Sequence, residues 1–211
     1  MDSIFPGEVS LFDSLPVRSE IPIEDGALSL WQPLLPSYEA ESLFTQLTKT
    51  LNWKQDDMTI AGKRIPIPRL QAWYGDAGSH YGYSGITLPP LSWTEELLHI
   101  KQTIETITQR RFNSVLANYY RNGQDSVSWH QDNEPELGHN PVIASLSLGA
   151  TRQFQLRHIS GRHPTIKLNL PHNALLLMSG NTQQNWSHQI PKTKKAVGPR
   201  INLTFRLIKG E

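Results

Sequence analysis

The chain contains no cysteine among its 211 residues. This absence excludes a disulfide scaffold, a cysteine-ligated zinc or iron–sulfur site and a thiol nucleophile. No run of 18 or more apolar residues occurs, so we expect no transmembrane helix. The first ten residues, MDSIFPGEVS, lack the basic start and the long apolar core of a signal peptide. We therefore expect a soluble intracellular protein, cytoplasmic if bacterial and nuclear if eukaryotic.

The net charge is also small, at +1, but acidic and basic residues are distributed unevenly along the chain. Residues 1–60 contain ten acidic and three basic side chains, a net of −7. Residues 61–211 contain nine acidic and seventeen basic side chains, a net of +8. Chance can produce such an asymmetry; the alternative is a basic body that binds a polyanion by displacing counterions from its phosphates.

The length suggests a single domain, which we divide into three segments. Residues 1–35 are interrupted by prolines, and we expect an irregular acidic leader there. Residues 36–111 are expected to contain two helices, and residues 112–209 a β-rich core. We expect a monomer.

Apolar residues at helical spacing predict the two helices. The first follows Ser37 as a cap, and the second begins at Ser92, with Glu95 completing a capping box. Each helix should bury one apolar face, formed by Leu43, Leu47 and Leu51 in the first and by Leu97, Ile100, Ile104 and Ile107 in the second.

The stretch between these helices, residues 58–90, combines glycines with tyrosines and a tryptophan. This composition is poor material for a core and favours exposed loops or short hairpins, where recognition residues often lie.

From residue 112 onward the apolar pattern changes to a period of two. Many short alternating segments separated by turns predict a sandwich or barrel. The expected segments are 113–121, 126–132, 142–148, 152–158, 165–170, 174–178 and 200–208.

The last of these segments has one apolar and one polar face, because side chains alternate along a strand. The apolar face contains Ile201, Leu203, Phe205 and Leu207, and the polar face contains Arg200, Asn202, Thr204 and Arg206. A polar face of this kind can simply face solvent. Two arginines on one face can also hold a small di-acid or a phosphate through bidentate hydrogen bonds. Asn118 and Tyr120 share a face of the segment at 113–121 and could add neutral donors.

His130 and Asp132 point the same way if residues 126–132 form a strand. An imidazole and a carboxylate side by side are half of a metal site, although such a pair can also be a surface hydrogen bond. A distant histidine would complete a two-histidine, one-carboxylate triad, which suits non-haem Fe(II). Of the eight histidines, His188 lies where a further strand could enter the barrel.

Taken together, these motifs resemble the AlkB family of Fe(II)- and 2-oxoglutarate-dependent dioxygenases, particularly its DNA-repair members. The resemblance covers residues 68–206 and also includes the Tyr74–Gly78 and Tyr83–Gly85 stretches. It implies a mainly β fold with flanking helices: a double-stranded β-helix, or jelly roll, with an N-terminal lid that recognises a nucleotide.

The resemblance also implies the roles of the site residues. Fe(II) would be held by His130, Asp132 and His188, with O₂ and 2-oxoglutarate as co-substrates. The 2-oxoglutarate would be bound by Asn118, Tyr120, Arg200, Asn202, Thr204 and Arg206. A buried dianion needs such fixed cations and donors to recover its desolvation cost.

The implied reaction is oxidative demethylation of 1-methyladenine and 3-methylcytosine in DNA. The methylated base must be flipped out of the duplex, and Tyr83 and His130 would stack on its two faces. The implied substrate-binding residues are Arg69, Tyr81, Tyr83, Ser84, Asn133 and Glu134. Three lysines, Lys192, Lys194 and Lys195, could contact phosphates of the nucleic acid, or could simply be solvated surface residues.

One stretch departs from the family pattern. The finger that probes the duplex carries an aromatic residue in related enzymes, whereas here it reads Thr59-Ile60-Ala61-Gly62-Lys63. Single-stranded DNA or RNA therefore stays open as a substrate, as does a protein side chain. Two further alternatives are a catalytically inactive nucleic-acid-binding jelly roll, which the intact site disfavours, and a zinc hydrolase, which leaves the two arginines unexplained.

Overall fold

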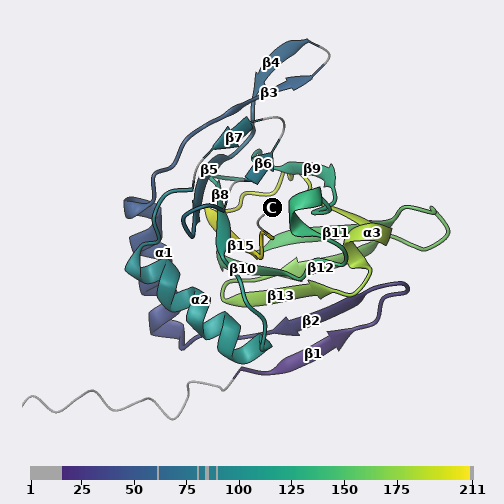
Figure 1. Cartoon of the computed structure of the whole chain (residues 1–211), viewed down its shortest axis with the longest axis horizontal. Helices are drawn as coiled ribbons and strands as arrows, with labels where there is room; N and C mark the ends of the chain where they lie inside the picture. Colours follow the sequence, from purple (N-terminus) through teal and green to yellow (C-terminus); the bar gives the residue numbers. More distant parts are fainter. Residues whose placement is uncertain (1–15, 61, 80, 84–85, 89, 210–211) are drawn as a thin grey trace, which may run out of the picture.

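Two β-sheets lie face to face in the computed structural model, and two helices cover the outer face of the larger sheet (Figure 1). The structure describes residues 16–60, 62–79, 81–83, 86–88 and 90–209, without the side chains of residues 60, 81–83 and 86–88.

The larger sheet has seven antiparallel strands in the order β1-β2-β13-β10-β15-β8-β5. Their bounds are β1 Arg18–Ile21, β2 Ala27–Trp31, β5 Leu70–Gly75, β8 Ser114–Tyr120, β10 Ile143–Gly149, β13 Ala174–Ser179 and β15 Arg200–Arg206. The smaller sheet has the order β12-β11-β14-β9, also antiparallel. Its strands are β9 Val127–His130, β11 Arg152–His158, β12 Ile166–Leu170 and β14 Trp186–Ile190.

The eight strands from β8 to β15 wind between the two sheets. Strands β8, β10, β13 and β15 are adjacent in the larger sheet, while β9, β11, β12 and β14 form the smaller one. This alternation is the double-stranded β-helix, and it confirms the expected mainly β fold. The alternating residues of each strand therefore divide between the space inside the sheets and the outer face.

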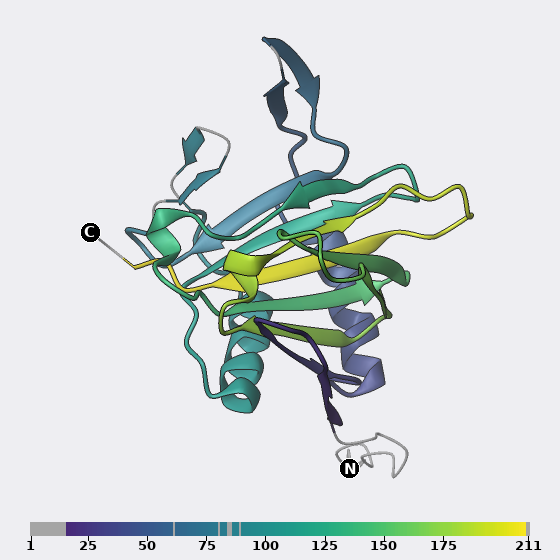
Figure 2. The ribbon, with the colours of Figure 1, turned by 90° about the vertical axis from the view of Figure 1, so that its right-hand side faces the viewer.

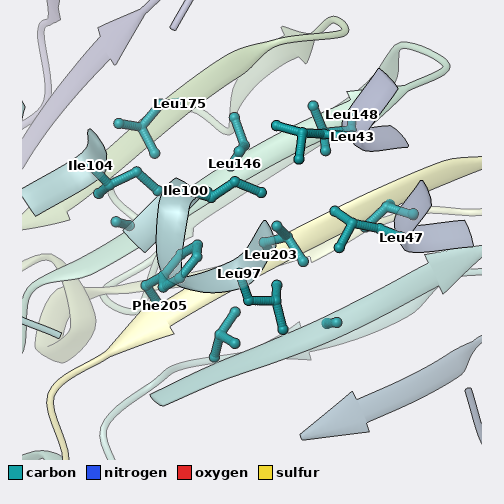
Figure 3. Close-up of a cluster of buried hydrophobic side chains, with 14 of the residues drawn as sticks. Leu43, Leu47, Leu97, Ile100, Ile104, Leu146, Leu148, Leu175, Leu203 and Phe205 are labelled. Atoms are coloured by element: carbon teal, nitrogen blue, oxygen red, sulfur yellow. The ribbon is translucent and has the colours of Figure 1, made fainter. Parts of the chain in front are cut away.

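Helices α1 (Ser37–Thr50) and α2 (Glu95–Thr108) pack on the outer face of the larger sheet. Figure 3 shows their leucines and isoleucines against Leu146, Leu203 and Phe205 of β10 and β15. The predicted apolar faces are buried, with Leu47, Leu97 and the isoleucines at 100 and 104 completely so. Two predicted members differ: Leu51 is buried but follows the last residue of α1, and Ile107 is only half-buried. Two short helices, η1 (Pro135–Leu137) and α3 (Thr182–Asn185), lie in connections.

Both predicted helix starts need correction. Ser37 is the first helical residue, and Pro36 occupies the N-cap position of α1. Helix α2 begins at Glu95, and its cap is Thr94, whose hydroxyl accepts a hydrogen bond from the Leu97 N–H at 3.3 Å. A hydroxyl two residues closer to the first turn thus takes the role expected of Ser92.

The expectation of an irregular leader is wrong for residues 18–31, which form β1 and β2. Strand β2 pairs with β13 and buries Leu28 and Trp31. Prolines flank these strands without interrupting them, so the proline pattern concealed a short hairpin. The larger sheet draws strands from all three segments of the chain, and the three-part division itself stays a prediction.

The glycine- and tyrosine-rich stretch contains two hairpins, β3–β4 (Asp57–Ile60, Lys63–Pro66) and β6–β7 (Tyr81–Tyr83, Ile86–Leu88). Both lie on the side of the molecule opposite β1–β2 (Figures 1 and 2). This confirms the hairpin expectation, but β5 joins the larger sheet and buries Tyr74, so the stretch also supplies core residues.

The last strand ends one residue earlier than its apolar pattern predicted. Leu207 was expected on the apolar face, but it follows the end of β15 and is 42% exposed. The next residue, Ile208, is buried.

Among the described residues, no helix has the length and apolarity needed to cross a membrane.

Candidate active site

The polar face of β15 points into the space between the two sheets. Arg200, Asn202, Thr204 and Arg206 are all at most 8% exposed, so this face does not meet solvent. On the neighbouring strand β8, Tyr120 lies opposite Arg200 and Asn118 opposite Asn202. The six residues predicted to bind 2-oxoglutarate all line one pocket, which also contains the three predicted metal ligands.

His130, Asp132 and His188 meet at one end of this pocket, and their ligand atoms all lie within 4.8 Å of one another. His130 on β9 is directly opposite His188 on β14, with ring centroids 4.2 Å apart. His188 Nε2 lies 3.8 Å from Asp132 Oδ2. Two imidazoles and a carboxylate in this arrangement form the ligand set predicted for Fe(II).

Asp132 reaches the cluster from a loop and not from a strand, which corrects the expected strand over 126–132. Strand β9 ends at His130. The backbone N–H of Asp132 donates to Gln183 Oε1 at 2.9 Å, and Gln131 Nε2 donates to the carbonyl oxygens of residues 183 and 184. Helix α3 therefore holds the loop that positions the carboxylate.

Asp132 is anionic despite being buried. Burial raises its pKa, but the positive charge of Arg206 beside it outweighs this and holds the pKa far below its usual range. Arg206 Nη2 donates to Asp132 Oδ1 at 2.8 Å. The other oxygen, Oδ2, is buried without a hydrogen-bond partner among the described residues, which leaves it free to bind a cation.

The two histidines are suited to metal binding. Burial lowers the pKa of His188 to about 3, so its imidazole is neutral at physiological pH. His130 Nδ1 lies 2.8 Å from the Ser128 carbonyl oxygen. A proton on Nδ1 satisfies that carbonyl and leaves the Nε2 lone pair for a metal.

At the other end of the pocket, Arg200 is 1% exposed and stacks over the Tyr120 ring at 5.2 Å. Burial lowers its pKa to about 10, which leaves it cationic at neutral pH. Its Nη2 donates to Ser147 Oγ, while Nε and Nη1 have no hydrogen-bond partner in the described part of the chain. A buried cation with unused donors is suited to a carboxylate ligand.

Neutral groups between the two arginines are fixed by a hydrogen-bond network. Asn202 Nδ2 donates to Ser145 Oγ at 2.8 Å, and Thr204 Oγ1 donates to Asn202 Oδ1 at 3.1 Å. Asn118 Oδ1 accepts from Arg69 Nε at 2.7 Å and from Gln71 Nε2 at 3.0 Å. The pocket is therefore preorganised.

Four polar residues that support the site were not predicted. Ser145 on β10 lines the pocket. The other three, Ser147 on β10, Gln71 on β5 and Gln183 on α3, hydrogen-bond to Arg200, Asn118 and Asp132, respectively. The serines alternate with apolar residues in a fully buried strand, a signal that could have identified them. Gln71 and Gln183 had no such signal, because only the strand pairing and the α3 contact bring them to the site.

The residues predicted to bind the substrate are placed less uniformly. Arg69 is 2% exposed and lines the pocket through Asn118, next to the 2-oxoglutarate set. Exposed Asn133 and half-buried Glu134 follow Asp132 on the loop. The backbone of Tyr81 and Tyr83 forms β6, but their side chains, like the whole of Ser84, lie outside the described residues.

The comparisons with known proteins agree with this geometry. The model of the 2OG-Fe(II) oxygenase superfamily matches residues 27–206. Alpha-ketoglutarate-dependent dioxygenase alkB homolog 3 of Bos taurus is 46% identical over 184 residues, covering 81% of this chain and 62% of its own. DNA oxidative demethylase ALKBH2 of Homo sapiens is 39% identical over 180 residues, and the match covers 81% of this chain and 69% of that protein.

The chain thus spans less than two thirds of the length of the alkB homolog 3 proteins that it matches. Among solved structures, that of OsALKBH1 superposes on this chain with a TM-score of 0.63 at 16% sequence identity. The superposition covers 90% of this chain and all of the OsALKBH1 chain. At this low identity the similarity supports the fold alone. On the superfamily match and the identities to these relatives, the chain belongs to the AlkB family of the 2OG-Fe(II) oxygenase superfamily.

Proposed function

We propose that this protein removes methyl groups from alkylated bases in DNA, 1-methyladenine and 3-methylcytosine, with Fe(II), O₂ and 2-oxoglutarate. The observation that carries the proposal is the buried cluster of His130, Asp132 and His188 beside a pocket that contains two buried arginines. The triad alone would also suit a zinc hydrolase, but a hydrolase has no use for the two cations. Several relatives are named DNA oxidative demethylases, which supports the substrate class.

The pocket residues fit both groups that the family uses. His130, His188 and the orphaned Oδ2 of Asp132 would hold Fe(II), leaving positions open for other ligands. Arg200 and Arg206 would bind the carboxylates of 2-oxoglutarate, with Asn118, Tyr120, Asn202 and Thr204 as hydrogen-bonding support.

With O₂, these groups supply oxidation of an N-methyl carbon to N-hydroxymethyl, while 2-oxoglutarate becomes succinate and CO₂. One oxygen atom enters succinate and the other the hydroxymethyl group, whose loss as formaldehyde, with release of a proton, restores the unalkylated ring nitrogen, N1 of adenine or N3 of cytosine. The protein contributes by orienting the methyl group and excluding water from a pocket whose cationic residues are nearly inaccessible.

The substrate would approach the triad from the His130 side. His130 is only half-buried, whereas Asp132 and His188 are at most 4% exposed. A methylated Watson–Crick edge must leave the duplex before it can reach this site, and stacking repays roughly 1–3 kcal/mol per base. We propose that Tyr83 and His130 sandwich the base. Five further residues would surround it: Arg69, Tyr81, Ser84, Asn133 and Glu134. The hairpins β3–β4 and β6–β7 would form the lid over the site.

Phosphate contacts would come from the connection between β14 and β15. Lys192, Lys194 and Lys195 are exposed there, close to the end of β14. Lysines in such positions increase affinity without reading sequence.

The test is an assay of formaldehyde and succinate release on methylated oligonucleotides, with DNA and RNA, single- and double-stranded, with and without iron. We expect iron-dependent release from methylated DNA, and none from the His130→Ala or Asp132→Ala variants. Activity on RNA alone would reassign the substrate. Wild-type release by both variants would overturn the iron site.

Stacking by Tyr83 is tested separately with Tyr83→Ala against Tyr38→Ala, a tyrosine 70% exposed on α1. Tyr83→Ala should raise the KM for the oligonucleotide and leave 2-oxoglutarate binding unchanged, and Tyr38→Ala should change neither. Equal kinetics of the two variants would remove Tyr83 from the proposed site.

A further inference from the structure

A second cluster of potential metal ligands lies outside the pocket. Asp25 in the β1–β2 turn, His158 at the end of β11 and His163 in the β11–β12 connection place their ligand atoms within 4.8 Å of one another. His158 Nε2 lies 3.5 Å from Asp25 Oδ2, and the rings of His158 and His163 are 4.6 Å apart. The β1–β2 turn and the end of β11 with its following loop thus bring three potential ligands to one point.

His158 is the strongest indication that this point binds a ligand. The residue is 6% exposed, and its Nε2 is buried without a hydrogen-bond partner among the described residues while facing the Asp25 carboxylate. A buried polar atom without a partner is rare and calls for an explanation. A bound cation between Nε2 and the carboxylate would provide one.

The other ring nitrogen of His158 is positioned as in a metal-bound histidine. Nδ1 lies 2.7 Å from Ser160 Oγ, which can accept its proton and so direct the Nε2 lone pair toward Asp25. The Ser160 N–H also approaches Nδ1, at 3.2 Å, and this longer contact would be lost in that tautomer.

The surroundings hold the three ligands in place. The ring of the buried Trp186 contacts His158 edge-on at 5.0 Å and lies 6.1 Å from His163. Its Nε1 donates to the Glu24 carbonyl oxygen at 2.8 Å, and Asn185 Nδ2 donates to the Asp25 carbonyl oxygen at 3.0 Å. The turn that carries the carboxylate is therefore anchored to the start of β14.

We propose that Asp25, His158 and His163 form a second metal site, which binds Zn(II). Two imidazoles and one carboxylate suit zinc, whereas Ca²⁺ and Mg²⁺ prefer oxygen ligands. The fourth position of a tetrahedral ion is available to water, because Asp25 is exposed. The site shares no ligand with the triad and does not depend on the proposed function.

A zinc ion at this position would connect the two sheets. Asp25 belongs to the β1–β2 hairpin of the larger sheet, and His158 to the smaller sheet. His158 is opposite Trp186 on β14, and Leu156 is opposite His188, two residues further along. The ion would therefore stabilise the strand that carries the third triad ligand.

The first test is the zinc content of the full-length chain after saturation with Zn(II) and removal of unbound metal. We expect about two ions per wild-type chain, one in each cluster. His163→Gln and Asp25→Asn should each retain one zinc ion, in the triad. His130→Ala should retain one zinc ion, in the second site. The double variant His130→Ala/His163→Gln should retain no zinc. His139→Gln is the matched control and should retain two zinc ions. His139 is exposed and belongs to neither cluster, and its ring is hydrogen-bonded to the Gln184 side chain.

A single zinc ion per wild-type chain would overturn the proposal and leave Asp25 and His158 without a metal, and an unchanged zinc content in His163→Gln would equally contradict it. The variants at 25 and 163 alter side chains that are exposed or half-buried, so circular dichroism should show native spectra. As a second readout, Zn(II) added after the triad is saturated with Mn(II) and 2-oxoglutarate should raise the Tm of wild type and of His139→Gln, but not of His163→Gln. An equal rise in His163→Gln would also contradict the second site.

Discussion

At the scale of single residues, the protein buries more positive than negative charge in the part that the structure describes. Among the described residues, four arginines are buried, but only two carboxylates, Asp125 and Asp132. Burying a charge is costly unless it is paired and hydrogen-bonded. The excess of cations favours an anionic ligand, and Arg200, with two unused donor nitrogens, is the residue most directly available to it.

Replacing Arg200 by methionine should weaken 2-oxoglutarate binding and leave the protein folded. Loss of a hydrogen bond to a charged group costs about 1.5–3 kcal/mol, roughly 10- to 150-fold in apparent affinity. The measurement is the KM for 2-oxoglutarate, with Arg110→Met, at an exposed site, as the matched control. An unchanged KM in Arg200→Met would exclude this arginine from the co-substrate site.

A second buried carboxylate, Asp125, should make stability depend on pH. Burial raises its pKa, but hydrogen bonds from the Arg121 side chain and backbone N–H outweigh this and hold the pKa below its usual value. Because the folded-state pKa is depressed, this stabilisation is present above the unfolded pKa, about 3.9, and is lost as pH falls through the folded pKa.

Asp125→Asn should therefore have a lower free energy of unfolding than wild type at neutral pH. As the pH falls, its free energy of unfolding should decrease less than that of wild type. The check is urea unfolding from pH 7 to pH 2.5, with Glu24→Gln, an exposed carboxyl, as the control. Parallel pH profiles for wild type and Asp125→Asn would show that the Arg121 pair contributes nothing.

At the scale of elements, strand alternation positions most of the site. Alternate residues of β15 enter the pocket, while Ile201, Leu203 and Phe205 pack beneath the helices. A strand with period two can serve both layers only because the larger sheet is covered on both faces. The same geometry places the serines of β10 beside Arg200 and Asn202.

The start of α2 offers a test of which hydroxyl caps the helix. Thr94→Ala should lower the free energy of unfolding by about 1 kcal/mol, because the Leu97 N–H loses its acceptor. Ser92→Ala, two residues earlier and exposed, should have little effect. Urea denaturation of both variants distinguishes them, and a larger loss in Ser92→Ala would restore the cap expected from the sequence.

At the scale of the whole molecule, ligands that bind only the folded site should stabilise the protein. Mn(II) with 2-oxoglutarate should raise the Tm, since a ligand at 100 times its Kd adds about 2.7 kcal/mol, and EDTA should reverse the part that depends on metal. His130→Ala should lose the metal-dependent rise, and Arg200→Met should lose much of the 2-oxoglutarate-dependent rise. A full response in both variants would place the ligands elsewhere.

Much of the fold could be predicted from local patterns, and the exceptions have physical causes. The jelly-roll strands and the buried helix faces follow from short periodicities. Strands β1 and β2 were missed because each is only four or five residues long and stabilised by pairing, not by its own pattern. Asp132 was expected on a strand, yet the loop after β9 delivers it, because Gln183 of α3 holds that loop.

The sequence by itself determined the chemistry of the side chains and the face of each strand on which they lie. Only the tertiary structure decided which distant residues meet. It brings His188 opposite His130, Arg206 onto Asp132, and Asp25 beside His158. Periodicity is local and can be read along the chain, whereas these contacts depend on strand order and register, which form only when two sheets pack around a shared interior.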